Sequence, residues 1–324
     1  MAHYDDELPR RRGEPGRRPA GGSNSLLLVA VFGAAGLLAV AAGVVGLWVA
    51  SEVVAPTAFP PATEDYATAR QKFKTTLTRK GPAPQAFADV TAPDDVDDVT
   101  FPSGDLTLRA WLTAEPEEIR VRKPAVLFLH GGFAFGEEDW AMAAPFEEAG
   151  FVVMIPMLRG ENGHAGDYTM FYDEVADVLA AADYLAAQPH VDPNRIYVAG
   201  HSAGGTLAML AAMAGPRFKA CAAMSGSPDQ PKWAEDQPEY VPFDPADETE
   251  FRMRSPLAFP ASLKCPARLY YGDEEPFFKR ATDDLARLAA AAGKDVKAEE
   301  VPGDHTAMTD AAIPRAIAFF NGVK

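Results

Sequence analysis

Short apolar runs alternate with longer helical patterns from about Asp89 onward, and this alternation constrains the fold more than any other feature. Parallel strands need a crossover between them, usually a helix, so the pattern predicts a mostly parallel sheet with helices on both faces. Runs that are apolar throughout, such as residues 126–129, fit strands buried on both sides. We assign strands to residues 125–129, 151–155, 196–199, 220–224, 267–271 and 296–301.

Two further strands, residues 96–101 and 106–112, precede the alternation and are joined by a Ser-Gly-Asp turn, which predicts a hairpin. In parallel sheets of this kind the chemistry lies at the carboxyl ends of the strands. The helices that we expect are residues 140–149, 173–187, 203–214, 278–292 and 311–320.

Residues 225–263 interrupt the alternation with a stretch rich in Pro, Asp and Glu that also carries several aromatic side chains. A loop this long in a compact domain is usually functional or disordered. We therefore predict a cap over the site, and the alternative is a plain surface excursion.

The N-terminal part has a different composition. Residues 1–25 are rich in Pro, Gly and Arg and predict a disordered tail, whereas residues 26–50 carry no formal charge and are mostly apolar. About 20 apolar residues span a bilayer, and signal-peptide cores are shorter, roughly 7–15 residues, so we expect an uncleaved transmembrane helix. The arginines before it and the acidic residues after it predict a cytoplasmic N-terminus and an extracytoplasmic remainder. Residues 51–88 form the connection, with a helix expected at 64–78.

The charge balance restricts the partners. The chain carries a net charge of -16, and the part beyond residue 50 carries -17. Such an acidic domain is repelled by nucleic acid, so we expect none as a partner. Two cysteines, Cys221 and Cys265, are too few for a disulfide scaffold or a structural zinc site, and they are either buried free thiols or one bridge.

A candidate nucleophile follows the strand at residues 196–199. The sequence Gly-His-Ser-Ala-Gly-Gly at 200–205 leads directly into an Ala- and Leu-rich helix, which is the strand–turn–helix context of a nucleophile elbow. Strand and helix approach so closely in this turn that side chains at positions 200 and 204 would clash, and both positions are glycine. Ser202 is therefore the predicted nucleophile.

The strand at 125–129 ends in His130 and two glycines. An oxyanion hole needs backbone N–H groups, one from the residue after the nucleophile, Ala203, and others from the loop after this strand. The sequence indicates Gly132 together with Phe133 or Gly131.

The order of a nucleophile-elbow hydrolase is Ser, then acid, then His. His305 follows the last strand and is the predicted base. The acid should follow the strand at 267–271, where Asp273, Glu274 and Glu275 compete.

These motifs, together with Arg254-Ser255-Pro256 and Gly303-Asp304-His305, resemble the α/β-hydrolase catalytic domain of the prolyl oligopeptidase (S9) family and related esterases. The resemblance covers the residues from about Pro124 to the C-terminus and implies an α/β-hydrolase fold. With the two preceding strands and the predicted cap at 225–263, we assign the α/β-hydrolase domain to residues 89–324. The resemblance also implies that Glu275, three residues after Gly272, is the acid, with Asp273 as the alternative. The Arg159-Gly160 loop resembles a loop of the same domains, and we expect Arg159 to pair with a nearby acid.

The resemblance implies a serine hydrolase acting through an acyl-enzyme on an ester or other small acyl substrate. S9 peptidases usually carry a β-propeller, for which the roughly 70 residues after the apolar run leave no room, so an S9-like peptidase acting on short peptides is the alternative. A second alternative is an inactive extracytoplasmic binding module. We expect no metal or organic cofactor, because the chain has no H-E-x-x-H, P-loop or dinucleotide motif. A metal-assisted alternative would use His130, His164 and Asp167.

Overall fold

The computed structural model describes residues 59–323. The predicted tail at 1–25 and the apolar run at 26–50 lie outside these residues. Within the described part, no helix combines the length and the apolar character that crossing a membrane requires.

The core of the described part is an eight-stranded sheet in the order β1-β2-β4-β3-β5-β6-β7-β8. The antiparallel pairs are β1 with β2 and β2 with β4, and all other neighbours are parallel, so the predicted hairpin and mostly parallel sheet are confirmed. The strands are β1 (Val96–Ser103), β2 (Leu106–Thr113), β3 (Lys123–Leu129), β4 (Val152–Pro156), β5 (Val191–His201), β6 (Cys221–Met224), β7 (Ala267–Gly272) and β8 (Val296–Val301).

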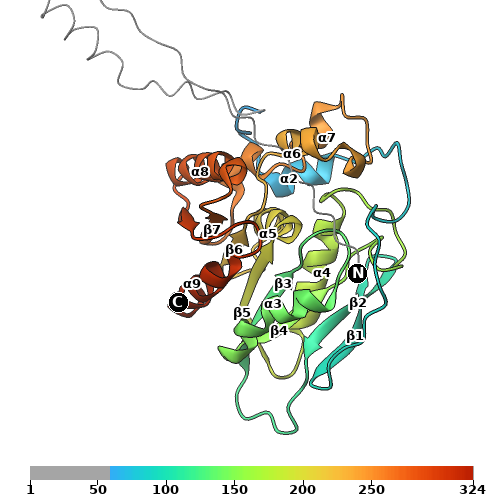
Figure 1. Ribbon diagram of the computed structural model, residues 1–324, viewed down its shortest axis with the longest axis vertical. Helices are drawn as coiled ribbons and strands as arrows, with labels where there is room; N and C mark the ends of the chain where they lie inside the picture. Colours follow the sequence, from blue (N-terminus) through green and yellow to red (C-terminus); the bar gives the residue numbers. More distant parts are fainter. Residues whose placement is uncertain (1–58, 324) are drawn as a thin grey trace, which may run out of the picture. The chain divides into compact units, whose positions relative to one another are not determined.

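Helices cover both faces of this sheet (Figure 1). Successive side chains of a strand point to opposite faces. Leu127 accordingly belongs to the hydrophobic cluster under α4, α5 and α8, whereas Val126 and Phe128 belong to the cluster under α3 and α9. The helices are α3 (Glu137–Glu148), α4 (Glu174–Ala186), α5 (Ala203–Ala214), α8 (Pro276–Ala291) and α9 (Thr309–Gly322).

Residues 59–95 pack against the rest of the domain. Helix α2 (Tyr66–Lys72) is shorter than the expected 64–78, and the Asp65 side chain caps it by accepting from the Ala67 N–H. Tyr66 is fully buried, and its hydroxyl donates to the Met253 carbonyl at 3.0 Å. This segment is therefore anchored to the stretch at 225–263 by a side chain in the core.

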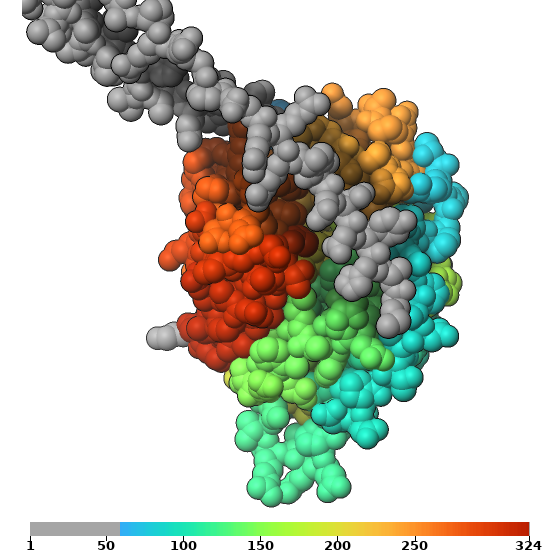
Figure 2. Space-filling model, viewed as in Figure 1, coloured from blue at the N-terminus to red at the C-terminus, as the bar shows by residue number. Residues whose placement is uncertain are grey.

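The stretch at 225–263 contains several short helices. Figure 1 shows α6 (Gln230–Asp236) and α7 (Glu248–Arg252) beside α2 at one end of the domain. Figure 2 shows the loop at 114–122 projecting at the opposite end. Three 3-10 turns complete the stretch: η1 (Pro238–Tyr240), η2 (Pro256–Ala258) and η3 (Pro260–Ser262).

Candidate active site

Ser202 lies in the tight turn between β5 and α5, with φ 54° and ψ −118°. A non-glycine residue in this region is strained, which is typical of functional turns. The neighbouring glycines make the turn possible: a Cβ on Gly204 would lie 2.0 Å from the Leu129 carbonyl oxygen, and one on Gly200 would lie 2.3 Å from the Gly204 carbonyl oxygen. The turn thus holds the hydroxyl at the carboxyl end of β5.

Three predicted side chains from distant parts of the chain meet here. Nε2 of His305 lies 2.9 Å from Oγ of Ser202, and Nδ1 of His305 lies 2.5 Å from Oε1 of Glu275. The second oxygen of Glu275 accepts from the Gly272 N–H at 2.8 Å and from the hydroxyl of Ser225. The carboxylate therefore fixes one side of the imidazole while the other side faces the serine.

The structure separates the competing acids. Glu275 is buried and binds His305, whereas Asp273 is exposed and accepts from the Gly303 N–H at 2.9 Å. Glu274 is exposed at the rim of the cavity beside Ser202. Asp273 therefore fastens the turn before His305 without reaching its ring.

Burial acts on the Glu275 carboxyl and by itself would raise its pKa. The hydrogen bonds from His305, Ser225 and Gly272 outweigh burial and hold the pKa below the ordinary value. Glu275 thus stays ionised at neutral pH, as stabilising an imidazolium requires.

His201 supports His305 in a way that its place beside the nucleophile does not reveal. Its Nε2–H donates to the His305 carbonyl oxygen at 2.6 Å. Burial lowers the pKa of His201 to about 4, so the ring is neutral at working pH. On the other side, Phe278 stacks on the His305 ring with 5.2 Å between centroids. Neither contact has a signal in the sequence.

Two backbone N–H groups of the loop after β3 are bound by side chains of the protein. That of Gly131 is directed at the Asp139 carboxylate, and that of Phe133 donates to Oε1 of Gln85 at 2.8 Å. Ala203 opens α5, so its N–H has no intrahelical acceptor. Of the predicted set, Gly132 and Ala203 remain as donors for an oxyanion.

His130 fixes the start of this loop through a buried contact. Its Nε2 lies 3.1 Å from Oε2 of Glu161, and both side chains are buried. Burial lowers the pKa of His130, but the Glu161 carboxylate outweighs it and raises the value to about 9. As expected from the resemblance, Arg159 pairs with an acid, binding the buried Asp177 through Nε and Nη2 at 2.8 and 2.7 Å.

A cavity of about 470 Å³ opens over the serine. Phe133 packs there against Trp233 and Tyr240, both from the stretch at 225–263, and against Phe171, with ring centroids 5.0 to 6.2 Å apart. Asp236 and Glu274 also line the cavity, and none of the described residues that line it is Lys or Arg. The cavity is thus an aromatic pocket with an acidic rim.

The remaining candidates have structural partners. His164 Nδ1 contacts the Glu161 carbonyl oxygen, and Asp167 accepts from the Gly81 N–H. Between residues 59 and 323, no group of three or more His, Cys, Asp or Glu side chains is placed to hold a metal ion. Cys221 and Cys265 are free and buried.

The family model described as the prolyl oligopeptidase family matches residues 139–312, more than half of the chain. The chain belongs to the prolyl oligopeptidase family. A curated relative is the uncharacterized peptidase YtmA of Bacillus subtilis (strain 168), which is 33% identical over 103 residues, 32% of this chain and 40% of that protein. The chain thus spans less than half the length of this curated relative.

Solved structures share the fold. A puromycin-hydrolyzing peptidase of Mycobacterium tuberculosis superposes with a TM-score of 0.60 at 23% identity, over 70% of this chain and 39% of that one. An esterase of Pyrobaculum calidifontis superposes with a TM-score of 0.57 at 21% identity, over 71% and 85%. The α/β-hydrolase fold therefore serves peptidases and esterases alike among the neighbours of this member of the prolyl oligopeptidase family.

Proposed function

We propose that this protein is a serine hydrolase that cleaves an ester or other small acyl substrate. The observation that carries the proposal is the unbroken line of contacts from Glu275 through His305 to Ser202, which ends in an open cavity. Nucleophile, base and orienting acid within hydrogen-bond reach are the geometric signature of covalent acyl transfer.

The reaction follows from these positions. Nε2 of His305 takes the hydroxyl proton as Oγ of Ser202 bonds to the carbonyl carbon of the substrate. The carbonyl oxygen becomes an anion, which the N–H groups of Gly132 and Ala203 hold. Glu275 stabilises the imidazolium. The carbonyl then reforms, the bond to the leaving group breaks, and His305 gives that group its proton. Water then attacks the acyl-enzyme in the same way, with His305 taking its proton, which releases the carboxylic acid and restores Ser202.

The cavity favours a defined substrate class. An aromatic wall favours an apolar or aromatic acyl group, and the carboxylates of Asp236 and Glu274 repel an anionic substrate. We therefore propose uncharged or cationic substrates over anionic ones.

A peptidase acting on short peptides is a second candidate, supported by the family and by the peptidase among the relatives. In the described part, residues 59–95 form one short helix and irregular segments that pack on the domain instead of a propeller. The arrangement supports the esterase proposal because a small, open pocket needs no substrate-filtering domain.

A comparison of leaving groups tests the proposal. We expect kcat/KM for p-nitrophenyl esters of short acyl groups to exceed that for matching aminoacyl p-nitroanilides, and Ser202→Ala to abolish both activities. A preference for the anilides would make the peptidase the function. No turnover of either by wild type, with tight binding retained, would make the protein a binding module.

We also propose that residues 26–50 anchor the chain in a membrane, with the N-terminus cytoplasmic and the catalytic domain outside. The support is the apolar run and the arginines before it. Protease added to intact cells should digest the domain and spare the N-terminal tail, and a protected domain would contradict this orientation.

A further inference from the structure

Gln85 comes from the segment before β1, yet its side chain lines the same cavity as Ser202 and His305. Its Oε1 accepts the Phe133 N–H at 2.8 Å, in the loop that supplies the proposed oxyanion donors. A residue nearly fifty positions before that loop is thus part of the wall beside the reacting carbonyl.

The backbone around Gln85 is fixed by bonds to one loop of the domain. The Ala83 N–H donates to the Gly160 carbonyl at 3.0 Å, and the Tyr168 N–H donates to the Gly81 carbonyl at 2.9 Å. The Gly81 N–H donates to Oδ1 of Asp167 at 2.9 Å. Three hydrogen bonds within three residues indicate that this segment is a fixed part of the cavity wall.

The contact with Phe133 also sets the direction of the amide. An N–H donor requires a carbonyl oxygen opposite it, so Nε2 of Gln85 must be on the other side of the group. Among residues 59–323, Nε2 has no acceptor. An amide held by its oxygen and open at its nitrogen has two N–H donors to offer a ligand in the cavity.

Gly132 makes room for this amide. Its φ is +65°, and a Cβ placed on it would lie 2.8 Å from Oε1 and 3.0 Å from Nε2 of Gln85. Any side chain at position 132 would therefore push Gln85 out of the wall as well as strain the backbone. The Gln85 amide lies directly against the backbone that supplies an oxyanion donor.

We propose that Gln85 is a substrate-positioning residue whose Nε2 donates a hydrogen bond to a second acceptor on the substrate, next to the scissile carbonyl. This inference rests on the proposed function and narrows its substrate class. Acyl groups that carry an amide or ester carbonyl beside the reacting one make this bond, whereas simple alkanoyl groups do not.

Two esters with the same leaving group test this role. We expect Gln85→Met to lower kcat/KM for the p-nitrophenyl ester of N-acetylalanine by about 3- to 10-fold, the range for one neutral hydrogen bond. For p-nitrophenyl butanoate only the lost acceptor for the Phe133 N–H should matter, so its kcat/KM should fall less and the ratio of the two kcat/KM values should drop. Gln85→Glu keeps an acceptor for the Phe133 N–H but loses the donor, so it should also lower the ratio of the two kcat/KM values.

The control is Gln188→Met, which removes a comparable amide whose Nε2 donates to the Tyr184 carbonyl away from the cavity; it should leave the ratio unchanged. An equal fall for both esters in both Gln85 variants would mean a purely structural role, and a rise for both would mean that the amide blocks the site. Either result overturns the inference. Labelling of Ser202 by a fluorophosphonate at wild-type rates in these variants would show that the proposed function survives such a failure.

Discussion

Two buried glutamates of this domain sit in hydrogen-bond networks that both border a cavity, but only one network places reactive groups at the cavity surface. Glu275 binds Ser225 and the Gly272 N–H on one side and His305 on the other, and His305 reaches the exposed edge of Ser202. The His305 imidazole is 42% exposed, so this network opens into the pocket.

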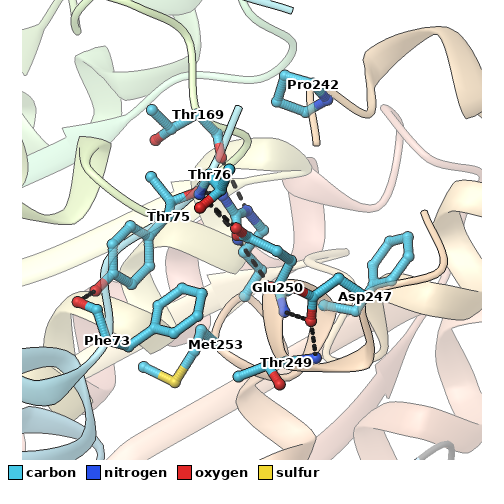
Figure 3. A network of polar contacts seen from close by, with 12 residues as sticks. Phe73, Thr75, Thr76, Thr169, Pro242, Asp247, Thr249, Glu250 and Met253 are labelled. Atoms are coloured by element: carbon cyan, nitrogen blue, oxygen red, sulfur yellow. Dashed lines mark hydrogen bonds and ion pairs between the residues drawn. The ribbon is translucent and has the colours of Figure 1, made fainter. Parts of the chain in front are cut away.

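Glu250 forms the other network (Figure 3), in which the ion pair between Glu250 and Arg254 is buried. Its oxygens accept from the Thr76 N–H at 2.6 Å, the Thr75 hydroxyl at 2.8 Å and Arg254 at 2.5 Å. Arg254 is fully buried, donates also to the Thr169 carbonyl, and lies over the Phe243 ring. The network joins the segment before β1, the stretch at 225–263 and the core.

The difference teaches that a buried carboxylate alone does not mark an active site. The Glu250 carboxylate and the Arg254 guanidinium are buried and bound to groups of the protein, which suits a rigid support. The Glu275 network instead ends in the Ser202 hydroxyl and the partly exposed His305 ring, which both line the cavity where a substrate would bind. Single substitutions can break each network separately.

The largest effect should come from Glu275→Gln. An amide cannot stabilise the imidazolium and favours the wrong tautomer, so we expect kcat to fall by about 10⁴-fold with little change in unfolding temperature. Asp273→Asn is the matched control and should stay near wild type, because its amide oxygen still accepts from the Gly303 N–H. Equal losses in the two variants would show that the acid is wrongly assigned.

Breaking the buried ion pair of the Glu250 network should reduce stability instead of catalytic activity. Arg254→Met leaves the Glu250 carboxylate buried without its partner, and we expect the free energy of unfolding to fall by about 3 to 5 kcal/mol in urea titrations. Arg120→Met, which removes an exposed ion pair with Glu118, should cost less than about 1 kcal/mol. A loss that small for Arg254→Met would contradict the supporting role of this network.

A smaller effect concerns Glu174, which accepts from the N–H and hydroxyl of Thr169 beside the Arg254 network. Burial raises its pKa from 4.5 to about 7, so the folded state holds a proton that the unfolded state releases. Stability should therefore decline as pH rises from about 4.5 through about 7, by up to about 3 kcal/mol from this group.

Glu174→Gln removes that titration. Its stability relative to wild type should rise across the same pH window, and thermal unfolding at pH 5 and pH 8 measures the difference. A constant difference between the two proteins at both pH values would mean that Glu174 does not titrate there.

Much of the fold follows from local patterns. The helix after Ser202 begins and ends at the predicted residues, Ala203–Ala214, because its apolar pattern is long and a strand–turn motif fixes its start. The serine and histidine of the site lie at strand ends, where the order along a parallel sheet predicts their meeting. The choice of Glu275 came from the resemblance.

Other parts of the site have no local signal. Gln85 reaches the site from an irregular segment, which hydrogen bonds hold against the loop at residues 160–168. Ser225 reaches it from a turn with positive φ directly after β6. His201 stands in a recognised motif, yet its bond to the His305 carbonyl depends on how two distant loops pack. The membrane anchor at 26–50 lies outside the described residues and stays a prediction.

The most direct test of the central claim is the site of covalent modification by a fluorophosphonate. Wild-type protein should gain one adduct by intact-mass measurement, peptide mapping should place it on Ser202, and Ser202→Ala should gain none. Labelling of Ser202→Ala at the wild-type rate, or an adduct on another residue, would contradict the assignment of Ser202 as the nucleophile.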